Sequence, residues 1–361
     1  MSSKKTYSEA QIPSVEEINE LLPYLLKRDH VARYEDGRVW ITDRRKYPFE
    51  KTQLACATVD EVAAAVEEMV TQGGGPSIAA AFALAMAAGQ NENLPEDQFL
   101  QTLQRASTRL IETRPTNTAL RIFLERLLRT AVKVHQEGKS AEQAVLDQIR
   151  AVREQTLKDY WLRGRYGADL IRDGDGILTM CFAESSFTMA LALARQDGKD
   201  LRVFVPETRP YLQGARLTAP SLQELGVPVT LITDNMPAHL LSQGKVNKFF
   251  TAADLITLDG HVVNKIGTFQ IALAASYHRV PYFAFMWGVD RESPDRDSVS
   301  IEERKPADIR SCRGEPTTLE SIPAYYPAFD ITPPHLVSGI ITDRGLFSPY
   351  DLANQFSETE S

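Results

Sequence analysis

Hydrophobic positions between residues 58 and 172 recur at the spacing of amphipathic helices. Val59, Val62, Ala63 and Val66 share one helical face. Thr58 precedes them as a typical N-cap residue, with Glu61 three residues later as the partner of a capping box. The pattern predicts that this first helix stops at a glycine run. Further helices are predicted over residues 77–89, 96–112, 117–137 and 140–172.

After residue 172, short apolar runs alternate with helical stretches. We expect strands at residues 177–181, 201–205, 227–232, 255–258 and 282–286. Strands that alternate with helices are typical of βαβ units and a parallel sheet. Ligands of such sheets bind beyond the carboxyl ends of the strands. Cys181 ends the first of these runs, and Glu207, Asp234 and Asp259 follow others.

The first 57 residues have a weaker, mixed pattern. Asp36-Gly37 is a hairpin turn signal, and a short strand is predicted over residues 38–42. The expected fold class is therefore α/β. We expect a small, mainly helical N-terminal domain with a short β element over residues 1–150, and a Rossmann-like C-terminal domain with a parallel sheet over residues 151–361.

Composition narrows the class of protein. The chain has 361 residues, 43% hydrophobic and 24% charged, as in an ordinary globular protein. Its apolar runs fall short of the ~18 residues of a membrane span, and the first ten residues lack the apolar core of a signal peptide. We therefore expect a cytoplasmic protein without a membrane partner. The formal net charge of -8 argues against nucleic-acid binding.

Cysteine and histidine spacing argues against a metal site. Cys56, Cys181 and Cys312 are far apart and form no CxxC pair, and the six histidines show no HxxxH or HExxH spacing. The sequence therefore predicts no metal and no disulfide framework.

Two breaks between the predicted helices are candidate anion sites. Gly73, Gly74 and Gly75 precede a helix whose first N–H groups could face an anion. A tight turn between helices explains them equally well. Arg114 lies in the next break and could bind a phosphate, although a solvated arginine is the more common outcome.

The strand ends of the second half carry further candidates. Cys181 is either a structural cysteine or a reactive one. Asp254 stands in the largely apolar run 249–258, where burial would raise its pKa; the alternative is an acid that faces solvent at a strand edge. Gln213 belongs to a polar segment, 207–216, of the kind that holds ligands. Lys265 is expected near the start of a helix that runs to residue 278, as a phosphate ligand or a surface lysine.

Four stretches together carry a family resemblance. They are ETRPYLQGARLTA at 207–219, LITDNMPAH at 231–239, NKIGT at 264–268 and PAFDITP at 327–333. The chain resembles the methylthioribose-1-phosphate isomerase family, part of the superfamily of initiation factor 2B α/β/δ subunits and ribose-1,5-bisphosphate isomerases. The similarity runs from about Tyr34 to about Tyr350.

This resemblance implies the site and its partners. By motif position, Cys181 and Asp254 match the two catalytic residues of the family. Ligand contacts are implied for the glycine loop (Gly73, Gly74, Gly75), for Arg114 and Gln213, and for the Asn264-Lys265 pair. A homodimer formed through the sheet-containing domain is also implied.

The implied activity is an intramolecular oxidoreduction that isomerises an aldose 1-phosphate to the ketose 1-phosphate. The substrate that the resemblance implies most directly is S-methyl-5-thioribose 1-phosphate of methionine salvage, and the product is S-methyl-5-thioribulose 1-phosphate. Asp254 would act as the acid that assists ring opening, and Cys181 as the base of an enediol route. A direct hydride shift between apolar walls is the alternative. Neither route requires a cofactor.

Several positions depart from the family pattern. Anchored on Pro76, Gly73 stands where the family's glycine loop has an arginine. Residues 182–186 differ after the cysteine, Leu255 replaces an arginine after Asp254, and Asp259 and His261 replace the Asn and Asp of an NGD sequence. The alternatives are therefore a paralogue that isomerises 5-deoxyribose 1-phosphate or ribose 1,5-bisphosphate, or a non-catalytic regulatory protein. Retention of Cys181 and Asp254 favours an enzyme.

Overall fold

The computed structural model describes residues 7–115 and 117–356. It divides the chain into two compact units: unit 1 comprises residues 1–23 and 158–361, and unit 2 comprises residues 24–157. Helix α7 (Ala141–Leu170) contributes to both, and residue 150, the expected domain boundary, lies inside this helix.

Unit 2 combines a small antiparallel sheet with helices. The sheet order is β1 (Ala32–Glu35), β2 (Arg38–Thr42) and β3 (Gln53–Cys56). The predicted strand at 38–42 is confirmed. Asp36 and Gly37 form the two-residue turn, both with positive φ, as a type I′ hairpin requires. The helices of this unit other than α7 are α2 (Arg28–Val31), α3 (Val59–Glu67), α4 (Gly75–Gln90), α5 (Glu96–Ile111) and α6 (Thr118–Gln136).

Helix α4 forms the centre of the unit 2 core. Every residue from Ala79 to Ala88 is buried. Because alanine side chains are short, α3, α5 and α6 can all pack closely around α4. Thr58 caps α3 by accepting a hydrogen bond from the Glu61 N–H, as its sequence pattern predicts.

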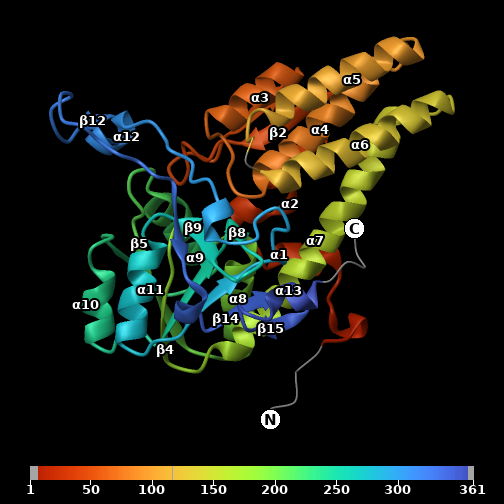
Figure 1. The fold of residues 1–361 in the computed structure, drawn as a ribbon. Coiled ribbons are helices and arrows are strands. Elements are labelled where there is room, and N and C mark those ends of the chain that lie inside the picture. Colours follow the sequence, from red (N-terminus) through yellow and green to blue (C-terminus); the bar gives the residue numbers. More distant parts are fainter. Residues whose placement is uncertain (1–6, 116, 357–361) are drawn as a thin grey trace. The chain divides into compact units, whose positions relative to one another are not determined.

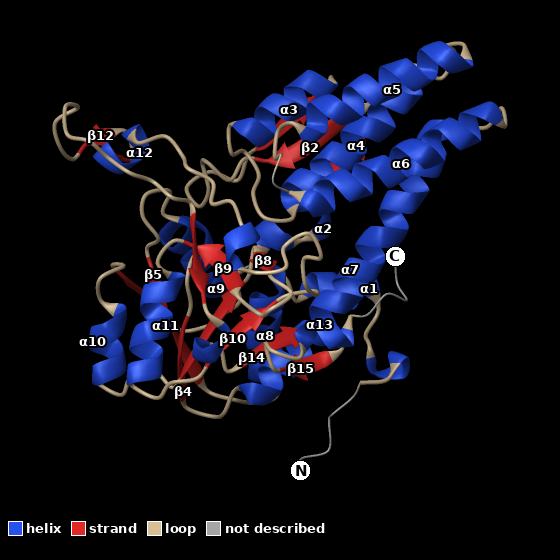
Figure 2. Cartoon of the chain, viewed as in Figure 1, coloured by secondary structure: helices blue, strands red, loops and turns tan. Residues whose placement is uncertain are grey.

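Unit 1 is built on a seven-stranded sheet (Figures 1 and 2). Its order is β15-β14-β10-β7-β4-β5-β6, and only β15 is antiparallel to its neighbour. The strands are β4 (Asp175–Leu178), β5 (Leu201–Pro206), β6 (Val229–Ile232), β7 (Lys248–Ala252), β10 (Tyr282–Phe285), β14 (Gly339–Thr342) and β15 (Gly345–Phe347). The mainly parallel sheet and the helical N-terminal half confirm the expected fold class.

The strand order reverses between β4 and β7. From β4 the chain moves outward through β5 and β6, crosses back to β7, and then moves outward the other way through β10 and β14. In open α/β sheets, this reversal leaves a crevice beyond the carboxyl ends of the two central strands, where ligands bind. The chain segments after β4 and β7 are therefore the ones to examine for a site.

Two expectations about residues 248–268 are wrong. The parallel strand is Lys248–Ala252 and not 255–258, because the apolar run 249–258 is longer than one strand and periodicity could not locate its end. Leu255–Ile256 is β8 of a separate antiparallel sheet with the order β13-β9-β8. Residue 264 does not open a helix either: β9 spans Val262–Lys265, β13 spans Phe329–Thr332, and α11 begins at Thr268.

Helices complete unit 1. They are α1 (Val15–Glu20), the end of α7, α8 (Glu184–Gln196), α9 (Ala219–Glu224), α10 (Pro237–Ser242), α11 (Thr268–Tyr277), α12 (Ala307–Arg310) and α13 (Leu352–Gln355). Helices α10 and α11 lie side by side (Figure 1). Figure 2 shows the excursion after β10 mainly as loops, with α12 and the hairpin of β11 (Ser311–Cys312) and β12 (Glu315–Pro316) extended from the sheet.

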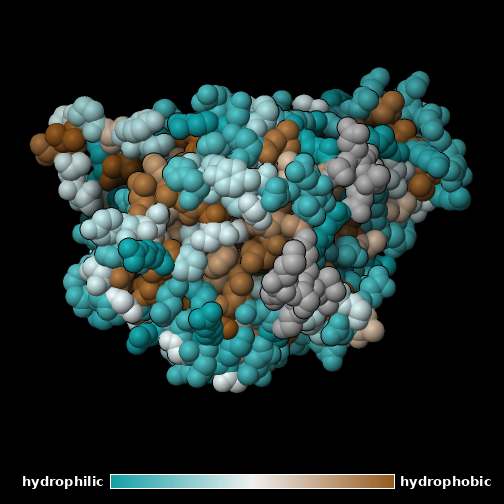
Figure 3. All heavy atoms as spheres, turned by 60° about the horizontal axis from the view of Figure 1, so that its bottom comes forward, coloured by the Kyte–Doolittle hydropathy of each residue, from teal (hydrophilic) through white to brown (hydrophobic). Residues whose placement is uncertain are grey.

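Hydrophobic side chains reach the surface in patches between hydrophilic ones (Figure 3). Among the residues that the structure describes, no helix has both the length and the apolar composition that crossing a membrane requires.

Candidate active site

Cys181 follows β4, the strand next to the reversal of strand order. All four residues of β4 are buried. Gly176 is required there, since a Cβ would lie 1.9 Å from the carbonyl oxygen of Lys245. Cys181 itself is half-buried and has a φ of 62°, in the left-handed region that a non-glycine residue adopts at a cost.

Hydrogen bonds hold Cys181 in this conformation. Its N–H donates to Thr208 Oγ1 at 3.1 Å, and its carbonyl oxygen accepts from Thr218 Oγ1 at 2.5 Å. Thr208 lies after β5, also has a positive φ, and is completely buried. Asp234, which follows β6, accepts from the N–H groups of Thr208 and Arg209 at 2.7 Å each. Three consecutive strand ends are therefore joined, and strained residues fixed in this way are typical of functional sites.

Asp254 follows β7, on the other side of the reversal. Its N–H donates to the carbonyl oxygen of Val263 at 2.9 Å. Asp254 is exposed, as the solvent-facing alternative from the sequence expects, yet desolvation of its carboxyl by the surrounding protein raises its pKa. The positive charges of Lys265 and Arg304 oppose this rise but do not reverse it. The acid form of Asp254 is thus favoured relative to an ordinary aspartate.

Lys265 and Asn264 lie on β9 and are both buried. The Lys265 ammonium lies 4.4 Å from the centre of the Phe329 ring, as a cation–π pair. Asn264 Nδ2 donates to Thr268 Oγ1 at 3.0 Å. Desolvation lowers the pKa of Lys265, although Cys181 and Asp254 act in the opposite direction. Lys265 is therefore a desolvated cation close to both reacting candidates.

Electrostatics link the two reacting candidates. Desolvation raises the pKa of Cys181 to about 11; Lys265 opposes the rise and Asp254 adds to it. Each of the three side chains is thus close enough to affect the ionisation of another. With such a pKa the thiol, and not the thiolate, dominates at neutral pH.

Gln213 is also placed by the segment after β5. It is buried immediately before the π-helical turn Gly214–Thr218. Gly214 packs against β5: a Cβ would lie 1.8 Å from the carbonyl oxygen of Pro206. Glycine is therefore the residue that lets this turn, and Gln213 with it, approach the strand end.

The remaining predicted site residues belong to unit 2. Gly73 has a φ of 60°, and Gly75 begins α4. Arg44 is buried and donates to the Gln72 carbonyl at 2.9 Å. Arg114 donates to the Val66 carbonyl at 2.7 Å and so lies against the end of α3, which leads into the glycine loop.

The predicted residues thus form two groups, one in each unit. Cys181, Gln213, Asp254, Asn264 and Lys265 belong to unit 1, and the glycine loop and Arg114 belong to unit 2.

Sequence reasoning assigned no role to several residues around Cys181. Thr208 and Asp234 stand in stretches that carry the family resemblance, so the signal was present but its role was not readable. Arg304 lies in an irregular segment without periodicity, and its contact with the Phe329 ring, which Lys265 also contacts, identifies it together with its influence on Asp254 and Cys181.

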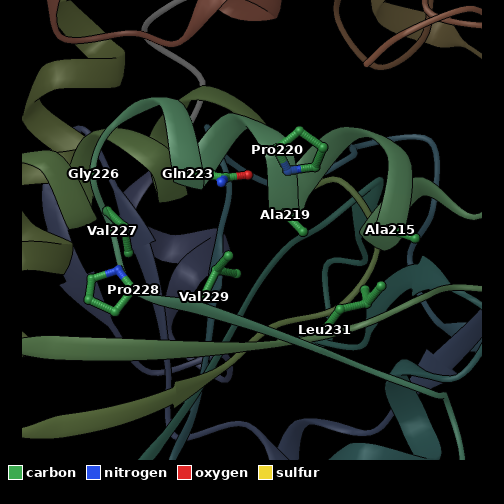
Figure 4. Close-up of a pocket in the computed structure, with 9 residues that line it drawn as sticks. All are labelled: Ala215, Ala219, Pro220, Gln223, Gly226, Val227, Pro228, Val229 and Leu231. Atoms are coloured by element: carbon green, nitrogen blue, oxygen red, sulfur yellow. The ribbon is translucent and has the colours of Figure 1, made fainter. Parts of the chain in front are cut away.

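Within residues 7–115 and 117–356, no three His, Cys, Asp or Glu side chains gather as a metal ion would need. A groove of about 610 Å³ lies along β6 and α9 (Figure 4), and Gln223 is the one polar side chain among its nine lining residues. Since it offers no charge, this groove is unsuited to a sugar phosphate.

Comparisons with known proteins agree with the geometry. The model of the initiation factor 2 subunit family matches residues 74–349. A methylthioribose-1-phosphate isomerase of Pelotomaculum thermopropionicum is 36% identical over 329 residues, which cover 88% of this chain and 90% of that protein.

Solved structures give the same result. The 5-methylthioribose 1-phosphate isomerase of Pyrococcus horikoshii OT3 has a TM-score of 0.80 and 30% identity, covering 95% of this chain and 97% of that chain. The translation initiation factor eIF-2B subunit delta of A. fulgidus has a TM-score of 0.77 and 32% identity, covering 89% of this chain and 96% of that chain. The chain therefore belongs to the initiation factor 2 subunit family, in the branch of the methylthioribose-1-phosphate isomerases.

Proposed function

We propose that this protein is an aldose-1-phosphate to ketose-1-phosphate isomerase, an intramolecular oxidoreductase, that converts S-methyl-5-thioribose 1-phosphate to S-methyl-5-thioribulose 1-phosphate. One observation carries the proposal: Cys181 and Asp254 follow the two strands that flank the reversal of strand order, with Lys265 near both. The names of the relatives indicate the same substrate.

Asp254 is suited to the first step. An aldose 1-phosphate is a cyclic acetal, so the ring opens only when its oxygen receives a proton as the C1–O bond breaks. The raised pKa of Asp254 keeps a proton available for this transfer. The step leaves an Asp254 carboxylate, which Lys265 and Arg304 then stabilise.

Cys181 is assigned to the hydrogen transfer from C2 to C1. In an enediol route its thiolate removes the C2 proton and returns it to C1, while the C2 hydroxyl proton passes to the Asp254 carboxylate as the C2 carbonyl forms. Because the pKa of Cys181 is about 11, roughly one thiol in ten thousand is ionised at pH 7. A direct hydride shift from C2 to C1 needs no thiolate, and Cys181 would then only line the wall of the substrate pocket. Turnover in deuterium oxide separates the routes, since only the enediol route incorporates solvent deuterium at C1.

Two departures from the family pattern concern the substrate. Gly73 replaces the family's loop arginine, and the segment after Cys181 differs as well, so 5-deoxyribose 1-phosphate and ribose 1,5-bisphosphate belong in the same assay. Ligand contacts are assigned to the glycine loop and Arg114 in unit 2 and, separately, to Gln213, Asn264 and Lys265 in unit 1. Within unit 2, the α4 N-terminus and Arg114 carry the positive potential that a phosphate needs, and within unit 1 Lys265 does so.

The decisive experiment measures ketose 1-phosphate formation from these three pentose phosphates. We expect turnover by the wild type and a loss of at least about a hundredfold in kcat for Cys181→Ser and Asp254→Asn. Cys312→Ser is the matched control, because Cys312 lies on β11, in the excursion after β10. If no sugar phosphate were converted but one raised the melting temperature, a non-catalytic sensor would replace the enzyme.

We also propose that the protein is a cytoplasmic homodimer and that the groove of Figure 4 is part of the dimer interface. Apart from Gln223, the side chains that line the groove are apolar, and they include Leu231 on the edge strand β6, which is 52% exposed. Edge strands with exposed apolar side chains are normally covered. Light scattering of the wild type should give a dimer mass, and Leu231→Glu should shift it toward the monomer.

A further inference from the structure

Residues 302–304 are fixed to residues 326–328, which lead into the strand that pairs with Lys265. The Arg304 N–H donates to the Tyr326 carbonyl at 2.9 Å, and the Ala328 N–H donates to the Glu302 carbonyl at 2.8 Å. Between them Glu303 forms a bridge with Pro327. The chain then enters β13, in which Phe329 pairs with Lys265 of β9. Backbone hydrogen bonds thus place this segment beside the candidate site.

The Arg304 side chain shares an aromatic ring with Lys265. Its guanidinium carbon lies 5.8 Å from the centre of the Phe329 ring, and the Lys265 ammonium lies 4.4 Å from the same centre. Arg304 Nε donates to Glu302 Oε1 at 2.8 Å, and the side chain is 19% exposed. A guanidinium held by a carboxylate and a ring, on a main chain that is itself hydrogen-bonded, has little freedom to move.

The charged groups around the reacting pair come from several elements. Arg304 lowers the pKa values of Cys181, Asp254 and Lys265, whereas Glu302 raises those of Asp254 and Lys265. The titratable and charged groups that act on one another here are Cys181, Asp254, Lys265, Glu302, Arg304, Tyr326, Asp308 and Asp330.

We propose that Arg304, fixed by Glu302 and by the ring of Phe329, is a positioning residue that favours the anionic forms of Cys181 and Asp254. It acts through its charge and does not itself react. When Asp254 gives its proton to the ring oxygen, Arg304 stabilises the carboxylate that is left. If Cys181 takes a proton from C2, the same charge favours the thiolate that must form first. The two reaction steps named here rest on the proposed function, whereas the effect of Arg304 on the ionisation of Cys181 does not.

Alkylation of Cys181 tests the proposal without turnover. Iodoacetamide reacts with the thiolate, so well below the pKa its rate follows the ionised fraction. Mass spectrometry of the Cys181 peptide between pH 8 and 10 gives this rate. A nearby opposite charge lowers a thiol pKa by about one unit or more, and Glu302 offsets part of the effect. We expect Arg304→Met to slow the alkylation about threefold to tenfold, and Arg304→Lys to stay within about twofold of wild type.

Two controls, the Glu302→Gln variant and the Cys312 peptide, separate the effect of the Arg304 charge from the effect of lost packing. Glu302→Gln breaks the same ion pair but removes an anion, so Cys181 should react no more slowly than in the wild type. The Cys312 peptide, from the same excursion, should react at one rate in every variant. Equal Cys181 rates in wild type and Arg304→Met would overturn the proposal. So would an Arg304→Lys variant as slow as Arg304→Met, or a Glu302→Gln variant slowed to the same degree.

Kinetics supply the second measurement. Arg304→Met should lower kcat about tenfold with KM within about twofold, because Arg304 acts on groups that change charge during the reaction. A rise in KM alone would overturn the positioning role and indicate a substrate contact. If the wild type converts no sugar phosphate, the proposed function fails, whereas the alkylation rates still decide on Arg304.

Discussion

Thr208→Val removes one hydroxyl that connects two strand ends. Thr208 Oγ1 accepts from the Cys181 N–H at 3.1 Å and donates to the Pro206 carbonyl at 3.2 Å, and the residue is completely buried. Valine keeps the shape and the β-branch, so the cost of the positive φ is unchanged. The Cys181 N–H loses its acceptor, and an unsatisfied buried donor costs about 1–3 kcal/mol.

A loss of about 2 kcal/mol should be visible in thermal unfolding. For a domain of about 150–250 residues, each kcal/mol shifts the melting temperature by about 2–4 °C, so we expect a decrease of about 4–8 °C. The Cys181 backbone is then free to leave its strained conformation. Since displacement of a reacting group by about 1 Å can cost about a hundredfold in rate, kcat should fall about tenfold to a hundredfold.

The assay combines differential scanning calorimetry with initial rates on S-methyl-5-thioribose 1-phosphate. Thr208→Ser is the matched control, because it keeps the hydroxyl and should retain both the melting temperature and most of kcat. A Thr208→Val protein that unfolds at the wild-type temperature and keeps its kcat would refute the view that this hydroxyl holds Cys181.

Three further changes test other parts of the site. Gly214→Ala places a Cβ 1.8 Å from the Pro206 carbonyl oxygen and should lower the free energy of unfolding by about 3 kcal/mol or more. The Cβ of Gly198→Ala meets open space, so this control variant should lose only about 1 kcal/mol, for its positive φ. Urea unfolding of the two variants compares these losses. Burial raises the pKa of Asp330 to about 6, so the folded state binds more protons than the unfolded state, and stability should fall by at most about 3 kcal/mol as pH rises from 4 to 7. The urea midpoint measured between pH 4 and 7 should fall with pH in the wild type and stay nearly constant in Asp330→Asn. An equal fall in both proteins would exclude Asp330 as the source of the pH dependence. Lys265→Met removes the cation with the largest effect on Cys181 and should slow its alkylation by more than about tenfold, beyond the range expected for Arg304→Met. A smaller effect than that of Arg304→Met would contradict the order of the two cations.

The sequence alone determined the elements and their class. Helical spacing predicted the helices of unit 2, and the Asp36-Gly37 signal predicted the hairpin that the structure contains. Alternating strands and helices predicted the parallel sheet. These features are local, because periodicity and turn residues record which face of each element is buried and where the chain reverses.

Only the tertiary structure decided which strand ends meet. Local patterns do not encode strand order, so the sequence could not show that β4 and β7 are neighbours or that Cys181 and Asp254 flank the reversal between them. The end of β7 was misplaced for a related reason, since a long apolar run has no internal boundary. The ionisation of Cys181 and Asp254 depends on distances to charged groups across the fold. The role of Arg304 could therefore be inferred only from the structure, in which backbone hydrogen bonds and the Phe329 ring place it beside Lys265.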